Sequence, residues 1–302
     1  MNYINISFTN EMEKISFVNQ CEQDFEKRLC EVSRRVKDAG AEILLLSGPT
    51  CSGKTTTANK IIHDFEQSGR PVTVISLDDF FKPRTETRSV DSGEEIDYDS
   101  INAIDLDTLT ECALNAKLGA TLDVPVYDFI SQTTSHYRRV EIDENGVIIF
   151  EGIQAVYPEI TRLFEDRDYV GVFINVDDDV MVNGVFFSRD DIRLSRRLVR
   201  DYKFRGADAE FTLFLWDNVR ANEDKSIYPN KNKICKIQLN SLMDYELFLL
   251  KGYIIDILNE VSENSKYYSK ARELKEKFLK LDTISYDYVP EKSLYTEFLG
   301  KK

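Results

Sequence analysis

The chain has 302 residues, of which 42% are hydrophobic and 30% are charged, and this composition is typical of a globular protein that buries a core. Its formal net charge of −14 argues against a protein that binds nucleic acid, because phosphate backbones are held by a surplus of Lys and Arg. Five scattered cysteines, only two histidines, no apolar run of about 18 residues and no signal-peptide core at the start predict a cytoplasmic protein with reduced thiols, no zinc site and no membrane span.

Residues 1–40 predict an N-terminal arm followed by a helix. Residues 1–20 show no clear periodicity, and we expect a strand or an ordered arm there. A helix is predicted from Cys21 to Lys37, and Gly40 can end it. The apolar face of this helix contains Phe25, Leu29, Val32 and Val36. We expect it to cover one face of a sheet.

The stretch Ile43–Ile62 predicts a buried strand, a glycine-rich turn and a helix. The turn fits the pattern G-x-x-x-x-G-K-[ST], in which glycines let successive backbone N–H groups point at an anion and the helix N-terminus adds its dipole. Lys54 can then reach the β- and γ-phosphates of a nucleotide, and the Thr55 hydroxyl can ligate magnesium. We therefore predict a nucleotide-binding P-loop that contains Gly48, Ser52, Gly53, Lys54, Thr55 and Thr56.

Carboxylates follow two further predicted strands. Val72–Leu77 leads to Asp78 and Asp79, and Val147–Phe150 leads to Glu151. Two more strands are predicted at Tyr169–Ile174 and Ile234–Asn240. Alternation of such strands with helical stretches predicts an α/β fold, a P-loop NTPase with a doubly wound, mostly parallel sheet. Ligands bind at the carboxyl ends of these strands, so Asp78 and Glu151 are candidate site residues.

The segment between the second and third strands is polar. Lys82–Asp97 is rich in charge without periodicity, and we expect a mobile loop over the site. Asp105 can cap a helix that runs to about Lys117. A short extended piece, Asp123–Phe129, precedes the polar stretch SQTTSHYRR.

Arg189–Arg205 predicts a basic helix in an otherwise acidic chain. Arg193, Arg196 and Arg200 fall on one helical face. Interleaved aspartates leave open a solvated helix with internal ion pairs. The triphosphate expected at the P-loop favours a lid helix whose arginines face the phosphates.

The remaining chain predicts a helix from Glu210 to about Lys225 and two later helices, Met243–Val261 and Lys266–Lys280. The two later helices form either a small helical subdomain or a contact for a homo-oligomer. We expect an N-terminal arm and helix over residues 1–40, a P-loop core with its lid over 41–242 and a C-terminal helical extension over 243–302.

Several classes of P-loop protein lack support in the sequence. A GTPase needs N-K-x-D, but Asn230–Lys233 is N-K-N-K, and no LSGGQ-like signature of a transporter ATPase is present. A strand-end carboxylate and an arginine-bearing helix remain, and this pair is typical of kinases.

Five ordered segments between Ala41 and Asn240 resemble the uridine kinase branch of the uridine kinase/phosphoribulokinase family. They are SLDDFF (Ser76–Phe81), YDSINAID (Tyr98–Asp105), VPVYDF (Val124–Phe129), IIFEG (Ile148–Gly152) and RLSRRLVRDYKFRG (Arg193–Gly206). The resemblance implies that the γ-phosphoryl group of ATP is transferred to the 5′-hydroxyl of a ribonucleoside such as uridine or cytidine, with Mg²⁺.

The resemblance also implies roles for individual residues. Asp78 would act as catalytic base, Asp99 would hold the ribose hydroxyls, and Tyr127 would line the base pocket. Glu151 would serve the metal with Thr55. The catalytic set would be completed by Lys54 and Arg196, which offset transition-state charge, while Arg193 and Arg196 would contact substrate.

Three features depart from the family pattern: Gln132 stands where a base-contacting histidine is expected, Ala207 replaces a second lid arginine, and an insertion covers Val180–Arg189. One alternative is a kinase of another small alcohol, such as a sugar phosphate or a pantothenate-like acid. A sugar-phosphate acceptor would need extra cationic residues in the loops of residues 82–140. These loops contain Lys82, Arg84, Arg88, Arg138 and Arg139. A nucleotide-binding regulator without turnover is the second alternative.

Overall fold

The computed structural model describes residues 1–83, 85 and 98–301. Most of the loop expected at Lys82–Asp97, including Arg84 and Arg88, therefore lies outside the described residues. Among the described helices, none is long and apolar enough to cross a membrane.

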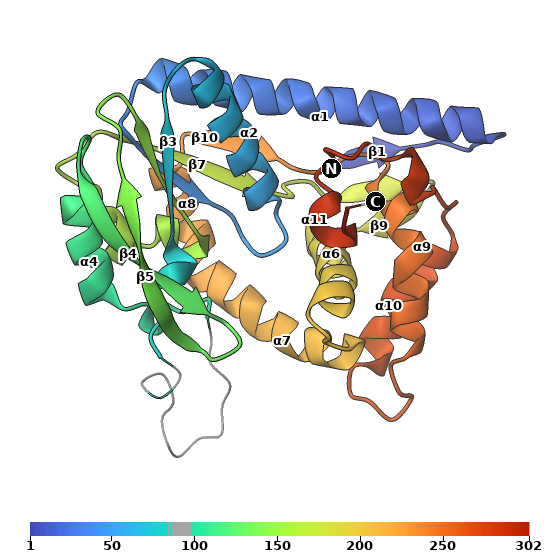
Figure 1. Cartoon of the computed structure of the whole chain (residues 1–302). Coiled ribbons are helices and arrows are strands. Elements are labelled where there is room, and N and C mark those ends of the chain that lie inside the picture. The colour runs from blue at the N-terminus through green and yellow to red at the C-terminus, as the bar shows by residue number, and fades with distance from the viewer. Residues whose placement is uncertain (84, 86–97, 302) are drawn as a thin grey trace.

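A five-stranded parallel sheet lies at one end of the molecule, and the C-terminal helices lie at the other (Figure 1). Its order is β10-β7-β2-β6-β3, so the strand before the P-loop is the middle one. The strands are β2 (Ile43–Ser47), β3 (Val72–Ser76), β6 (Val147–Glu151), β7 (Tyr169–Asn175) and β10 (Ile237–Asn240). The chain places β3 and β6 on one side of β2 and then β7 and β10 on the other side. The predicted doubly wound parallel sheet is therefore confirmed.

Successive residues of β2 point to opposite faces of the sheet, and each face has its own hydrophobic cluster. Leu44 and Leu46 join a cluster with α1 (Glu11–Ala39), α2 (Lys54–Gln67) and the C-terminal helices. Ile43 and Leu45 join a second cluster with α4 (Leu106–Asn115) and with β4 (Thr121–Asp128). The sheet is therefore buried on both sides, as parallel sheets require.

Helix α1 is longer than the sequence pattern predicted. It begins at Glu11, where the Asn10 side chain accepts a hydrogen bond from the N–H of Glu13, and it ends at Ala39, followed by Gly40 in the left-handed conformation. Val18 is the one buried residue in its first ten positions, so the apolar periodicity is too weak there to reveal a helix. The rest of α1 covers the sheet as expected.

Two small sheets were not predicted. The polar stretch after Phe129 is a strand, β5 (Thr133–Glu141), which pairs antiparallel with β4 (Thr121–Asp128). Most of β5 is exposed, and it therefore lacks the apolar alternation that identifies a strand. The 180–189 insertion forms the hairpin β8 (Val180–Val182) and β9 (Val185–Phe187), and β1 (Asn2–Ile4) pairs with β8.

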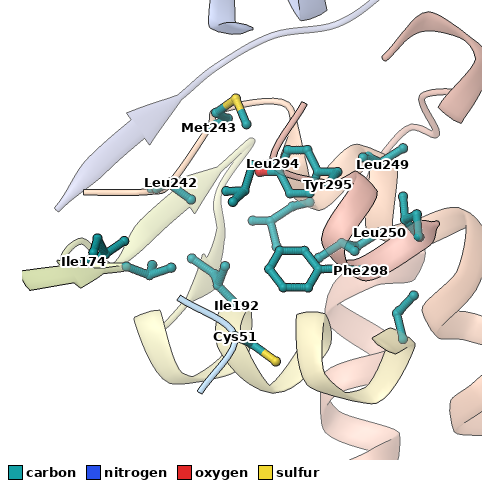
Figure 2. Close-up of a cluster of buried hydrophobic side chains, with 14 of the residues drawn as sticks. Cys51, Ile174, Ile192, Leu242, Met243, Leu249, Leu250, Leu294, Tyr295 and Phe298 are labelled. Atoms are coloured by element: carbon teal, nitrogen blue, oxygen red, sulfur yellow. The ribbon is translucent and has the colours of Figure 1, made fainter. Parts of the chain in front are cut away.

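The C-terminal helices pack into the same cluster as the P-loop. They are α9 (Glu246–Asn259), α10 (Tyr268–Leu279) and α11 (Thr296–Leu299). Figure 2 shows Cys51 of the P-loop near Ile192 of α6 (Arg189–Phe204), in the cluster that also contains Tyr295 and Phe298. Residues from all three expected segments, 1–40, 41–242 and 243–302, thus share one hydrophobic cluster.

Candidate active site

The loop between β2 and α2 has the backbone geometry of an anion cradle. Gly53 has a φ of 95°, and a side chain at Gly48 would place its Cβ 2.2 Å from the carbonyl oxygen of Ile174 in β7. Both glycines are thus required, one by conformation and one by space. Lys54 Nζ donates to the carbonyl oxygens of Gly48 (2.8 Å) and Pro49 (3.2 Å), and so folds back over the loop.

Two further residues of this loop fit a nucleotide. The buried Ser52 hydroxyl has no hydrogen-bond partner among the described residues, and a phosphate oxygen can supply one. Thr55 is exposed at the first turn of α2. Both lie at a helix N-terminus, where an anion is favoured.

Glu151 lies at the end of β6 beside the P-loop strand. The strand register places it opposite Leu46 of β2 and opposite Ser76 of β3. Ser76 Oγ donates to Glu151 Oε1 at 2.6 Å and fixes the carboxylate. This position brings the predicted Glu151 to the same end of the sheet as the P-loop.

Asp78 follows β3 in a short 3₁₀ turn, Leu77–Phe80. Burial raises the pKa of its carboxyl from the ordinary 3.8 to about 6, and the negative charges of Glu151 and Asp99 add to this rise, while Lys54 lowers it. An acid with this pKa ionises near neutral pH and can accept a proton there. Asp78, Glu151, Asp99 and Lys54 therefore lie within one electrostatic neighbourhood.

Four aromatic rings gather next to these carboxylates. Phe81 lies three residues after Asp78, and Tyr98 directly precedes Asp99. Tyr127 and Phe129 come from the end of β4. Every pair among the four has ring centroids between 4.9 and 6.4 Å apart. Phe129 is 54% exposed, so the cluster opens to solvent on one side.

The segment that carries Asp99 is held by two residues that the sequence interpretation missed. Gln154 Nε2 donates to the Tyr98 carbonyl oxygen, and the Tyr157 hydroxyl donates to the Asp99 carbonyl oxygen, both at 2.8 Å. Both follow Glu151 within six residues. Gln132, expected near the base, lies in the β4–β5 turn with a φ of 55°.

The two predicted lid arginines do not face the open side of the site. Arg193 and Arg196 are fully buried, each against a glutamate: Glu223 for Arg193 and Glu246 for Arg196. Arg200, on the same helical face, pairs with Asp201. The helix itself and its arginine face were predicted, but the glutamates that meet Arg193 and Arg196 were not.

The C-terminal segment also reaches the P-loop, which no sequence pattern indicated. A Cβ at Gly53 would lie 2.5 Å from Leu294 Cδ1, and the Thr56 hydroxyl donates to Glu297 Oε2 at 3.4 Å. Burial raises the pKa of Glu297, while Lys54, Arg196 and Arg200 oppose that rise. A carboxylate thus lies beside the first turn of α2.

The residues present suit a magnesium ion that is held partly by substrate phosphates better than a metal ion that is held by protein side chains alone. Within residues 1–83, 85 and 98–301, no group of three or more His, Cys, Asp or Glu side chains is placed to hold a metal. Magnesium commonly takes one or two protein oxygens together with substrate phosphates. The Thr55 hydroxyl and the Glu151 carboxylate are two protein oxygens of the kind that magnesium takes as ligands.

Comparison with known proteins gives a family match over the core. The model of the Phosphoribulokinase / Uridine kinase family matches residues 43–237. A uridine kinase from Saccharomyces cerevisiae (strain ATCC 204508 / S288c) is 32% identical over 225 residues, which cover 73% of this chain and 41% of that protein. The chain thus spans less than half of that relative.

A second relative is covered more fully. A uridine kinase from Staphylococcus aureus (strain JH9) is 33% identical over 190 residues, which cover 63% of this chain and 83% of that protein. A solved structure of a possible uridine kinase from Bacillus stearothermophilus aligns with a TM-score of 0.48 and 19% identity, over 72% of this chain and 99% of that one.

The family model covers most of the chain, including the P-loop, Asp78, Glu151 and helix α6. This chain therefore belongs to the phosphoribulokinase/uridine kinase family.

Proposed function

We propose that this protein is a P-loop kinase that transfers the γ-phosphoryl group of ATP to the 5′-hydroxyl of a ribonucleoside. The observation that carries the proposal is the four-ring cluster of Phe81, Tyr98, Tyr127 and Phe129 beside Asp78 and Asp99. Aromatic rings bind the flat face of a nucleobase, and neighbouring carboxylates accept hydrogen bonds from hydroxyl groups. Family membership and the relatives named uridine kinase support a phosphotransferase with a small-molecule substrate.

The proposed reaction assigns the acceptor proton to Asp78. The acceptor hydroxyl attacks the γ-phosphorus in line, the bond from this phosphorus to the bridging oxygen of ADP breaks, and Asp78 takes the hydroxyl proton. Its raised pKa supports this role, because a base is most effective when its pKa lies near the working pH. Lys54 leaves the loop carbonyls and offsets charge on the transferred group.

Magnesium fits the proposal: Thr55 and Glu151 would hold it, and its positive charge would neutralise charge on the phosphate groups. Ser76 contributes by holding Glu151 through its hydroxyl. The P-loop residues Gly48, Ser52, Gly53, Lys54, Thr55 and Thr56 are proposed to bind the triphosphate.

The acceptor is proposed to bind between Asp99 and the aromatic cluster. Gln154 and Tyr157 hold the backbone of Tyr98 and Asp99 in position for it. A sugar phosphate is less well supported, because the described cations of the 82–140 region have protein partners. Lys82 donates to Asn102, while Arg138 and Arg139 pair with Asp79 and Asp123.

The test is an acceptor screen that measures ADP release by the purified protein with ATP and magnesium. The panel contains uridine, cytidine, adenosine, inosine, a sugar phosphate and pantothenate, and Lys54→Ala serves as the inactive control. We expect acceptor-dependent ADP release with at least one ribonucleoside. Turnover on a sugar phosphate or pantothenate alone would refute the nucleoside assignment, and no turnover on any alcohol, with ATP still bound, would favour a regulator.

A further inference from the structure

We propose that Arg193 and Arg196 are positioning residues that hold the P-loop backbone in its anion-binding form, rather than residues that contact phosphate. This proposal replaces the catalytic and substrate-binding roles predicted for them from the sequence. It rests on the nucleotide-binding part of the proposed function and is independent of the acceptor.

Both guanidinium groups bond to consecutive carbonyl groups of the P-loop. Arg193 Nε donates to the Thr50 carbonyl oxygen at 3.4 Å, and Arg196 Nη1 donates to the Cys51 carbonyl oxygen at 3.1 Å. The N–H of Ser52, in the same peptide unit as the Cys51 carbonyl, donates to Pro49 at 3.2 Å. Because a peptide unit is planar, bonds at its two ends fix its orientation.

The loop needs such a constraint at Cys51. This residue has a φ of 56°, in the left-handed region, which is unfavourable for a non-glycine residue. The backbone groups of residues 52–55 follow directly, and their direction depends on how the chain leaves Cys51. Holding the carbonyls of residues 50 and 51 therefore sets the cradle before any ligand arrives.

Arg196 has no N–H left for a phosphate. Its five donors are all used: two bonds reach the Glu246 carboxylate, one reaches Cys51, and two reach the hydroxyl and carbonyl oxygens of Ser241. The side chain is fully buried and its guanidinium lies 5.3 Å from the ring centre of Phe298. To reach a ligand it would have to leave the buried Glu246 unpaired, which is costly.

Arg193 is held in a similar way. It forms a bidentate pair with Glu223 and donates to the Tyr228 hydroxyl at 3.0 Å, and its guanidinium lies 5.3 Å from the Trp216 ring centre. Glu223 begins a π-helical turn after α7 (Ala209–Asn222), and Glu246 begins α9. The P-loop is thereby connected through α6 to α9, the first helix of the C-terminal extension.

The test separates positioning from simple stabilisation by removing both charges of one pair. In Arg196→Met/Glu246→Leu no charge is left unpaired, and replacing a buried ion pair by apolar residues is often neutral for stability. We expect a melting temperature close to that of the unchanged protein. Calorimetry with pyrophosphate and with ATP should show binding at least tenfold weaker, and amide exchange at residues 50–55 should become faster.

Two further variants complete the test. Arg196→Lys keeps a charge opposite Glu246 but cannot make five bonds, so it should fold and should also bind pyrophosphate more weakly. Glu22→Gln/Tyr245→Phe is the matched control, because it removes a part-buried hydrogen bond between Tyr245, next to α9, and Glu22, and neither residue belongs to the P-loop. Its pyrophosphate affinity should match that of the unchanged protein.

The proposal is overturned if both Arg196 variants bind pyrophosphate and ATP normally. If such normal binding is accompanied by a loss of turnover, Arg196 acts on the transition state instead. If the unchanged protein binds neither pyrophosphate nor ATP, the P-loop assignment itself is wrong. If ATP and pyrophosphate bind but no acceptor in the screen is phosphorylated, the nucleoside kinase assignment is refuted and the positioning role is unaffected.

Discussion

Asp78 and Asp79 are adjacent in the chain, but their carboxylates serve different parts of the structure. Asp79 accepts the N–H of Tyr127 at 3.4 Å and lies 3.8 Å from Arg138, so it ties the β4–β5 hairpin to the end of β3. Asp78 instead lies in the field of Lys54, Glu151 and Asp99. Under the proposed function, this division assigns the chemistry to Asp78 and the support of the aromatic cluster to Asp79.

Asp78→Asn should abolish most turnover while ATP still binds. The amide keeps the shape of the side chain but cannot accept the acceptor proton, and the loss of a positioned base typically costs a factor of about 10² to 10⁴. The measurement is single-turnover kinetics beside calorimetry with ATP and magnesium.

Asp79→Asn is the matched control for this prediction. It should raise the KM for the acceptor through a looser hairpin, with a smaller effect on kcat. Near-normal kcat in Asp78→Asn together with a large loss in Asp79→Asn would transfer the base role to Asp79.

The raised pKa of Asp78 also predicts a pH dependence of stability. The folded pKa, about 6, lies above the ordinary 3.8, so this group favours the folded state below pH 3.8, and that contribution is lost as the pH rises through 6. At pH 8 the ionised, buried carboxylate should destabilise the protein by at most roughly 3 kcal/mol. Asp78→Asn should therefore melt higher than the unchanged protein at pH 8, by a margin that shrinks towards pH 4.

Activity should follow the same ionisation. We expect kcat/KM for the acceptor to rise with pH through about 6, because only the ionised Asp78 accepts a proton. A stability margin or an activity that does not change between pH 4 and pH 8 would show that the Asp78 pKa is not raised.

The central sheet could be predicted from the sequence because its strands are short apolar runs with glycine-rich or acidic ends. The hairpin strand β5 could not, since an exposed two-stranded ribbon needs no apolar alternation. The P-loop and the strand-end carboxylates could be predicted because each motif lies within a few consecutive residues. The contact that fixes Glu151 through Ser76 could not be predicted, because it depends on the register between β3 and β6.

The partners of the predicted lid arginines could not be predicted from the sequence. Helical spacing placed Arg193 and Arg196 on one face, but it could not tell whether that face meets phosphate or carboxylate. Glu223 and Glu246 lie 30 and 50 residues further along the chain, and only the packing of α6 against later helices brings them there. Glu297 is still more remote from Thr56, 241 residues away.

Glu297→Gln should strengthen ATP binding. The carboxylate next to Thr56 lies at the helix N-terminus where phosphates are expected, and it opposes a second negative charge. Removing it should lower the Kd for ATP roughly fivefold, about 1 kcal/mol, with the effect decreasing at high salt.

Glu291→Gln, at an exposed position of the same segment, is the control and should leave the Kd unchanged. Weaker ATP binding in Glu297→Gln would instead mean that the carboxylate contacts the donor nucleoside.

Tyr157→Phe should weaken acceptor binding selectively. The ring stays in its buried place, but the hydroxyl no longer donates to the Asp99 carbonyl oxygen. One such hydrogen bond contributes about 0.5–1.5 kcal/mol, so the acceptor KM should rise roughly three- to tenfold while the KM for ATP stays the same. An equal change in both constants would indicate a general loss of stability, which a melting curve would reveal.

The acceptor itself should be a ribonucleoside rather than a deoxyribonucleoside. The charge of Asp99 contributes to the raised pKa of Asp78. We therefore expect a sugar bound at Asp99 to present its 5′-hydroxyl to the proposed base. One ionised carboxylate can accept hydrogen bonds from the neighbouring 2′- and 3′-hydroxyls, and a 2′-deoxynucleoside forfeits one of them. A hydrogen bond to a charged group contributes about 1.5–3 kcal/mol, which corresponds to a preference of roughly tenfold or more in kcat/KM. Steady-state kinetics with uridine and 2′-deoxyuridine measure this ratio, and Asp99→Asn should reduce it towards one. Equal kcat/KM values for the two nucleosides in the unchanged protein would exclude Asp99 as the ribose ligand.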